Sequence, residues 1–163
     1  MLRLVAETAL HTVLLPGTIV VLLPALVLSS EGALRRPAVS APALLGALLI
    51  ALGLAVVAWC TRDFLVRGRG TPNPLDPPKA VVTTGPYRRV RNPMYVSVAA
   101  ILVGEALVVG SLRLLGYTAV VVLGFHLFVV GYEERTLRRR FGASYDAYRA
   151  AVPRWLPRLS GPR

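Results

Sequence analysis

Four stretches of the sequence, each about twenty residues long, contain almost no Lys, Arg, Asp or Glu, and this pattern limits the folds open to the chain. A helix needs roughly twenty apolar residues to cross about 30 Å of hydrocarbon. Hydrophobic residues form 55% of the chain and charged residues 17%, which argues against a soluble globular domain. The first stretch could be a cleaved signal peptide, but it exceeds the roughly 7–15 residues of a signal core. The sequence predicts one all-α polytopic membrane domain over 1–163, with four transmembrane helices at 8–30, 40–61, 93–111 and 114–132.

The basic residues are distributed unevenly among the segments between these spans. If the N-terminus lies in the cytoplasm, the loop 62–92 and the tail 133–163 lie there too, and that side holds 16 of the 19 Lys and Arg residues. This positive-inside bias predicts that both termini are cytoplasmic. The excess of arginine over lysine and the abundance of alanine are compatible with a GC-rich bacterial genome, so we expect an integral protein of the bacterial inner membrane.

The composition also limits which ligands we expect the chain to bind and which kinds of metal or redox site it can form. The formal net charge of +11 suggests that the chain binds anionic membrane lipid or another anionic ligand, and we expect no nucleic acid partner. Cys60 is the only cysteine, which excludes an internal disulfide and any multi-cysteine metal or redox site. We therefore predict no metal centre.

The segment 85–95, before the third span, ends in a defined helix start. It reads Gly-Pro-Tyr-Arg-Arg-Val-Arg-Asn-Pro-Met-Tyr. Asn92 followed by Pro93 is typical of an N-cap with proline at the first helical position. The free N–H groups and positive dipole end of this helix, beside three arginines, would bind an anionic group. The simpler alternative is that the arginines contact anionic lipid headgroups.

The tail begins with two adjacent carboxylates and continues as an amphipathic pattern. Apolar residues recur at spacings of three and four, at Leu137, Phe141, Tyr145, Tyr148 and Val152. This stripe predicts a C-terminal interfacial helix, broken at Gly142. Glu133 and Glu134 could hold a ligand cation, and the alternative for Glu134 is an i, i+4 salt bridge with Arg138.

Two ionisable residues inside the spans are further candidates. Glu105 is a costly intramembrane carboxylate, which is expected to face the bundle interior or a water-filled cavity, or to stay protonated and bonded to Thr118 or to backbone. His126 lies near the cytoplasmic end of its span, either as a packed residue or as a ligand. At about 1.5 Å per residue from the turn at Arg113, Glu105 and His126 are at different depths and are poor direct partners.

The order of these motifs resembles the integral-membrane methyltransferases that include isoprenylcysteine carboxyl methyltransferase and the phospholipid N-methyltransferases. The resemblance covers roughly 85–157. It rests on the segment 85–95, which is similar to a Gly-x-Tyr to Arg-His-Pro-x-Tyr motif, on the acidic pair, and on the tail residues Phe141, Gly142, Tyr145, Tyr148, Val152 and Pro153. The resemblance implies a pocket for S-adenosylmethionine that opens to the cytosol, while a lipophilic methyl acceptor enters from the bilayer.

The same resemblance assigns residues to the cofactor site. Those implied to border the cofactor are Tyr87, Arg91, Asn92, Pro93, Tyr95, Glu133 and Glu134. Gly104, Glu105 and Ala106 stand where phospholipid methyltransferases carry a Gly-x-Gly motif that lines the site.

The chain departs from the family pattern at three places. Asn92 replaces the usual histidine, Ala106 replaces the second glycine, and Val129 and Val130 stand where the isoprenylcysteine enzyme carries a substrate-side arginine. The third difference argues against an isoprenylcysteine substrate.

These observations predict S-adenosylmethionine-dependent methyl transfer to a lipophilic small molecule or lipid at the cytoplasmic membrane interface. Transfer from a sulfonium requires chiefly that donor and acceptor are positioned and that water is excluded. We expect the glutamate pair to hold the ammonium of the cofactor, and Arg91 with the helix start to hold its carboxylate. A carboxylate acceptor needs no general base, whereas an amine or thiol does, with Glu105 and His126 as the catalytic candidates. The alternative is a non-catalytic membrane protein that binds anionic lipid or a partner through its arginine-rich cytoplasmic face.

Overall fold

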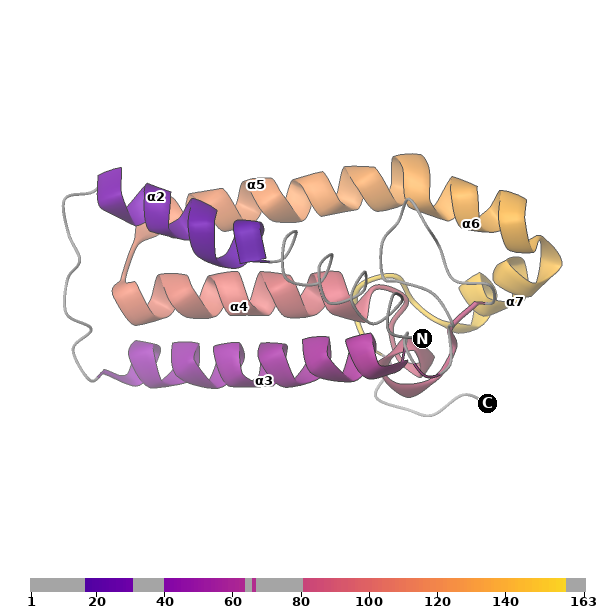
Figure 1. Cartoon of the computed structure of the whole chain (residues 1–163), viewed down its shortest axis with the longest axis horizontal. Helices are drawn as coiled ribbons and strands as arrows, with labels where there is room; N and C mark the ends of the chain where they lie inside the picture. Colours follow the sequence, from indigo (N-terminus) through magenta and orange to yellow (C-terminus); the bar gives the residue numbers. More distant parts are fainter. Residues whose placement is uncertain (1–16, 31–39, 64–65, 67–80, 158–163) are drawn as a thin grey trace.

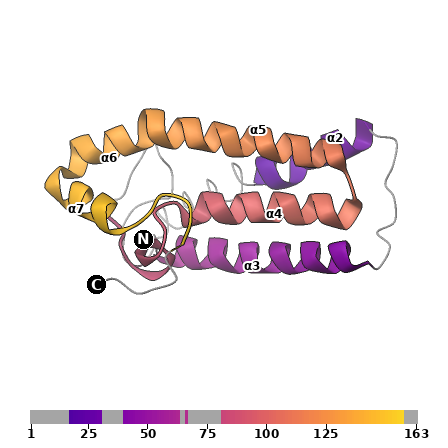
Figure 2. The ribbon, with the colours of Figure 1, turned by 180° about the vertical axis from the view of Figure 1, so that it is seen from behind.

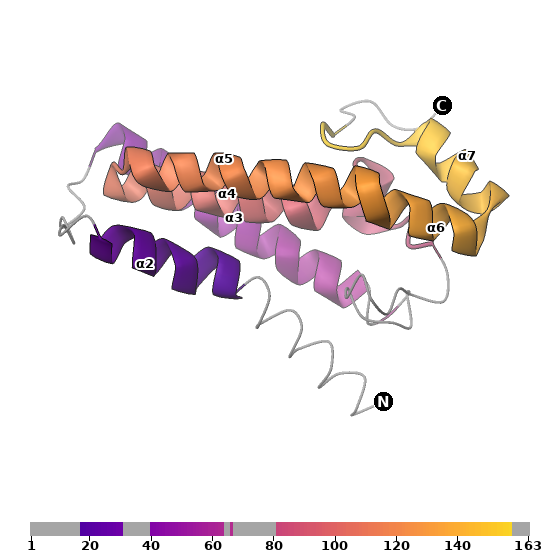
Figure 3. The same cartoon turned by 90° about the horizontal axis from the view of Figure 1, so that it is seen from above.

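The computed structural model of the chain describes residues 17–30, 40–63, 66 and 81–157 (Figure 1). Every regular element within those ranges is a helix, so the predicted all-α class is confirmed for them. The elements are η1 (Thr18–Leu22), α2 (Leu23–Ser30), α3 (Ala41–Asp63), η3 (Gly85–Arg88), α4 (Pro93–Val109), α5 (Leu112–Phe128), η4 (Val129–Glu133), α6 (Glu134–Phe141) and α7 (Ala143–Ala151). The helix α4 lies between α3 and α5, and α2 runs along α5 (Figures 1 and 3).

Two helices of the described part are long and apolar enough to cross a membrane. They are α3, with 23 residues, and the continuous helix of 30 residues from Leu112 to Phe141 that joins α5, η4 and α6. Thr18–Ser30 and Pro93–Val109 are apolar but shorter. Residues 8–16 of the predicted first span, and most of the predicted loop 62–92, lie outside the described residues.

The helix that contains the predicted fourth span, 114–132, extends beyond the end of that span. The helix continues to Phe141, because a π-helical turn at Val129–Glu133 carries the backbone hydrogen bonding into α6 without a break. At about 1.5 Å per residue such a helix is about 45 Å long, which exceeds the roughly 30 Å of hydrocarbon. The charged α6 is therefore an extension of the spanning helix.

Glycines allow α3 and α4 to pack closely. A Cβ on Gly46 of α3 would stand 2.5 Å from the carbonyl oxygen of Gly104 in α4. Two turns along α3, a Cβ on Gly53 would stand 2.9 Å from the carbonyl oxygen of Ser97. Small residues at a helix crossing let the two backbones approach, as is typical of helix pairs in membranes. This contact fixes α4, whose first residues build the candidate site, against α3.

The turn between α4 and α5 is a tight hairpin. The C-cap of α4 is Gly110 in the left-handed conformation, with φ 71°. The N-cap of α5 is Ser111, whose Oγ accepts a hydrogen bond from the backbone N–H of Leu114 at 3.1 Å. Further along α5, the Tyr117 hydroxyl donates to the carbonyl of Ile19 in η1 at 2.8 Å and so ties the first helix to the bundle.

The interfacial helix expected in the tail is two elements, α6 and α7, which meet at Gly142. This residue has φ 53° and ψ −128°, a combination that essentially only glycine adopts. The predicted break at Gly142 is confirmed. Because the chain reverses there, Tyr145 and Val152 are buried, and the residues after α7 return to the start of α4 (Figure 2).

The glycine contact predicts that Gly46→Ala destabilises the protein. The added methyl group meets the backbone of Gly104, so the two helices must separate, at an expected cost of about 1–3 kcal/mol. A matched control is Gly116→Ala in α5, where a Cβ meets nothing within 4 Å and where alanine favours helix by up to about 1 kcal/mol. Thermal unfolding in detergent compares the two variants, and a Gly46→Ala protein as stable as the wild type would contradict the close crossing.

Candidate functional site

The turn before α4 is attached to the end of α3. Gly85 has φ 55°, and a Cβ there would clash with the carboxylate of Asp63, which is buried. The Thr84 hydroxyl donates to Asp63 Oδ2 at 3.2 Å. In the same turn Tyr87 is buried, and its carbonyl oxygen accepts from the Tyr148 hydroxyl at 2.8 Å. Burial raises the pKa of the Tyr87 hydroxyl well above its usual value, so this side chain stays neutral.

The start of α4 lies under the C-terminal tail. As predicted, α4 begins at Pro93 with Asn92 at the N-cap position. The expectation that the Asn92 side chain caps the helix is wrong, because its Nδ2 donates to the carbonyl of Arg154 at 3.1 Å. The backbone N–H of Arg91 donates to the carbonyl of Pro153 at 2.9 Å. Two hydrogen bonds therefore fix the tail across the beginning of the helix.

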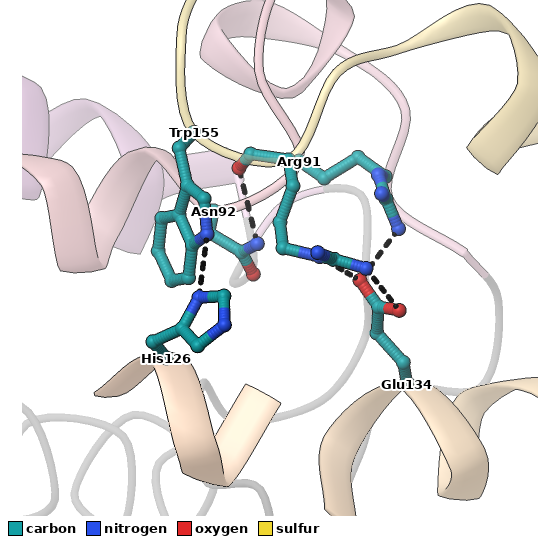
Figure 4. Close-up of polar contacts among 6 residues, drawn as sticks. Arg91, Asn92, His126, Glu134 and Trp155 are labelled. Atoms are coloured by element: carbon teal, nitrogen blue, oxygen red, sulfur yellow. Dashed lines mark hydrogen bonds and ion pairs between the residues drawn. The ribbon is translucent and has the colours of Figure 1, made fainter. Parts of the chain in front are cut away.

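Glu134 is the centre of a largely buried ion-pair cluster (Figure 4). Its Oε1 accepts from Arg91 Nη1 at 2.8 Å and from Arg154 Nε at 2.6 Å, and its Oε2 accepts from Arg154 Nη2 at 3.0 Å. The side chains of Glu134 and Arg91 are only 9% and 10% exposed. The hydrogen bond to Glu134 raises the pKa of Arg154 against the opposing effect of burial. The alternative of a Glu134–Arg138 bridge is wrong, since Arg138 pairs with Asp146 at 3.2 Å.

Glu133 faces the same helix start through a different contact. Its Oε2 accepts from the Tyr95 hydroxyl at 3.0 Å, and the Tyr95 ring packs on Phe125 with 4.7 Å between centroids. Glu133 is the last residue of the π-helical turn Val129–Glu133, and Glu134 comes directly after it. Such turns often occur at functional sites. The structure thus brings Arg91 and Tyr95 together with the acidic pair, from segments about forty residues apart.

One buried donor in this cluster has no hydrogen-bond partner. The Nε of Arg91 is buried and unpaired, although Nη1 of the same guanidinium is bound to Glu134. An unsatisfied buried donor is costly, and at a polar cluster it marks a position for an acceptor. The acceptor that best matches a guanidinium edge is a carboxylate or phosphate oxygen.

The predicted Gly-x-Gly positions lie apart from this cluster. Gly104 is packed against Gly46 and Ala106 is buried, so helix packing alone accounts for both. Glu105 is half-buried, and its Oε2 has no hydrogen-bond partner. The Thr118 hydroxyl, one expected partner of Glu105, donates to the carbonyl of Leu114 instead. Glu105 is twelve residues after Pro93, about 18 Å along the helix, so one ligand at Arg91 would not reach it. Their assignment to the cofactor site stays a prediction.

His126 is bound to the tail. The indole Nε1 of Trp155 donates to His126 Nδ1 at 3.2 Å (Figure 4). A neutral imidazole that accepts at Nδ1 carries its proton on Nε2, so in this arrangement neither nitrogen has a free lone pair with which to act as a base. A catalytic role for His126 would require Trp155 to release it.

The sequence patterns indicate Trp155 only as a residue at the membrane interface, without its contact to His126, and do not indicate Arg154 as a site residue. Arg154 follows Pro153, which belongs to the motif of the tail, but it stands 20 residues after Glu134, a separation that no helical periodicity links. The abundance of arginine in the tail indicates a partner for a buried carboxylate without indicating which one. Only the reversal at Gly142 brings the two side chains together.

Comparison with known proteins identifies one relationship. A family model described as phospholipid methyltransferase matches residues 42–144. The matched range covers α3 from its second residue, together with α4, α5, η4 and α6. It includes Arg91, Tyr95 and the two glutamates, and it ends before Arg154. No curated protein and no solved structure matches the chain.

The cluster predicts that Glu134→Ala lowers stability far more than Asp146→Ala. Removal of Glu134 leaves Arg91 and Arg154 without their buried partner, which is expected to cost about 3–5 kcal/mol. Asp146 pairs with Arg138 at the surface, where the side chains are 43% and 62% exposed, and its loss should cost less than about 1 kcal/mol. Unfolding in detergent with increasing denaturant measures both, and equal losses would contradict the central place of Glu134.

Proposed function

The chain belongs to the phospholipid methyltransferase family, and we propose that it is an integral-membrane enzyme that uses S-adenosylmethionine to methylate a lipophilic small molecule or lipid at the cytoplasmic interface. Membership implies methyltransferase activity. The observation that carries the rest of the proposal is the contact of Arg91 and Tyr95 with Glu134 and Glu133 at one end of the bundle.

The residues present suit the amino-acid end of this cofactor. The unpaired Nε of Arg91 is a buried cationic donor, which matches the carboxylate. Glu133 uses part of its acceptor capacity on the Tyr95 hydroxyl, and a carboxylate offers about four acceptor positions, so it can also hold an ammonium. When bound, S-adenosylmethionine supplies a methyl group on a sulfonium, which a nucleophile can displace.

The geometry divides the roles of the two glutamates. Glu134 accepts from Arg91 and from the Nε and Nη2 of Arg154, so its negative charge is already compensated. Glu133 has no ion pair described with these arginines and is the member of the pair that we assign to the ligand. Glu134 then holds Arg91 in place instead of contacting the ammonium.

Positioning is the main contribution that we propose for the chain. Glu105 is distant along α4 and His126 is bound to Trp155, so neither is placed to remove a proton at the Arg91–Glu133 cluster. This arrangement favours an acceptor that is nucleophilic without a protein base, such as a carboxylate. The acceptor would reach the cluster from the bilayer along the apolar surfaces of α4 and α5.

We also propose the membrane arrangement with four spans and cytoplasmic termini, in which the site lies at the inner leaflet. The helix α6 extends beyond the apolar part of its span and carries exposed arginines, namely Arg135, Arg138, Arg139 and Arg140. These side chains would meet anionic headgroups. The half-buried Trp155 and the exposed Tyr132 lie at the same end, as aromatic residues do at an interface.

Binding of S-adenosylmethionine and its loss in Glu133→Gln test the proposal. Purified protein in detergent should bind the cofactor saturably in calorimetry, and the variant should bind at least about 10-fold more weakly, because a hydrogen bond to a charged group contributes about 1.5–3 kcal/mol. Asp146→Asn is the matched control, since it makes the same change at a carboxylate whose side chain is 43% exposed and pairs with Arg138 at the surface.

Incubation of membranes with methyl-labelled cofactor, lipid extraction and mass analysis then identify the acceptor. Label should enter a lipophilic product with wild-type and Asp146→Asn protein and fall sharply with Glu133→Gln. A wild-type protein with no saturable cofactor binding and no labelled product would contradict the proposal and favour a non-catalytic protein that binds anionic lipid.

A further inference from the structure

The tail residues after α7 are fixed across the candidate site by their backbone as well as by side chains. The carbonyl of Pro153 accepts from the Arg91 N–H, the carbonyl of Arg154 accepts from Asn92 Nδ2, and the Trp155 indole donates to His126. None of these three bonds uses the Arg154 side chain. The guanidinium of Arg154 can therefore be changed while the remaining anchors of the tail are kept.

Arg154 and Arg91 bind the same carboxylate in different ways. Arg154 uses two donors, Nε and Nη2, one on each oxygen of Glu134 at 2.6 and 3.0 Å. Arg91 uses Nη1 alone, on Oε1 at 2.8 Å. The two-donor geometry is the stronger and the more directional of the two. Glu134 therefore has its fixed orientation from Arg154.

This difference determines what remains free on Arg91. If Arg154 did not hold Oε2, the carboxylate could turn and accept two parallel bonds from Arg91, which is the geometry that an isolated arginine–carboxylate pair prefers. A second bond of this kind would engage Nε or the other Nη of Arg91. The observed arrangement instead leaves Nε buried and unpaired.

We propose that Arg154 is a positioning residue, which holds both oxygens of Glu134 so that Arg91 keeps an edge of its guanidinium for the carboxylate of the methyl donor. The inference rests on the proposed function for the identity of that ligand. It assigns a role to a segment outside the family match, which ends at residue 144. It also explains why two arginines surround one glutamate: Arg154 orients the Glu134 carboxylate, and Arg91 binds the carboxylate of the methyl donor.

The test compares Arg154→Ala and Arg154→Lys with the wild type and with Arg149→Ala, which removes an exposed arginine of α7. Calorimetry with S-adenosylmethionine should give a Kd about 10-fold higher for both Arg154 variants, because lysine keeps the charge but lacks the planar pair of donors. Turnover at saturating cofactor should stay within about 2-fold of the wild type. Arg149→Ala should bind normally. If lysine restores full affinity, charge alone is sufficient and the inference is overturned.

A double variant separates positioning from general support of the fold. In Arg154→Ala, Glu134 competes for the donors of Arg91, so the additional change Glu134→Gln should recover part of the lost affinity. A purely structural role for Arg154 predicts that the double variant binds no better than Arg154→Ala, and that result would overturn the inference. Thermal unfolding of each variant confirms that the compared proteins are folded, and Arg154→Lys retains an ion pair if the alanine variant does not fold.

A cofactor-free measurement distinguishes this inference from the proposed function. In protein labelled with 15N on arginine, the Nε–H or the Nη2 protons of Arg91 should exchange with water more slowly in Arg154→Ala than in the wild type, because one of these donors gains Glu134 as acceptor. Unchanged exchange at both nitrogens overturns the positioning role even if the wild type binds cofactor normally. Slower exchange, together with no cofactor binding by the wild type, supports the arrangement of the arginines and rejects the donor as their ligand.

Discussion

The ion-pair cluster around Glu134 is the contact on which the rest of the site depends. It joins three segments that lie far apart in the sequence, namely the start of α4, the beginning of α6 and the tail after α7. The Glu134 carboxylate and the Arg91 guanidinium are largely removed from water there, while Arg154 stays partly exposed. Buried charges of this kind are tolerated only when their hydrogen bonds are nearly complete. The Nε of Arg91, the one buried donor of this cluster without a hydrogen-bond partner, is therefore the most informative atom of the site.

The helical bundle holds this cluster in place. The glycine contact between α3 and α4 sets the position of α4, and the turn at Gly85 attaches the segment before α4 to Asp63 at the end of α3. On the other side, the π-helical turn directs both glutamates toward the same helix start. The reversal at Gly142 then returns the tail to the cluster. An apolar helical scaffold thus carries polar groups at one end of the bundle.

Much of this arrangement could be predicted from local patterns in the sequence. The apolar stretches indicated the helices, Asn92–Pro93 marked the start of α4, and Gly142 marked the break in the tail. Predictions that depended on competition between partners were wrong: the Asn92 amide binds the tail instead of capping α4, and Glu134 pairs with two distant arginines instead of Arg138. Spacing along one helix identifies neighbours on that helix, but it does not rank them against partners brought close by a reversal of the chain.

The central claim is that the methyl donor binds between the start of α4 and the acidic pair. Photochemical cross-linking of S-adenosylmethionine that carries an isotopic label, followed by peptide mapping, tests this directly because it identifies the peptides that lie against the bound cofactor. The account predicts saturable labelling, competed by unlabelled cofactor, of peptides that contain residues 85–95 or 129–137. Saturable labelling confined to other parts of the chain would contradict it.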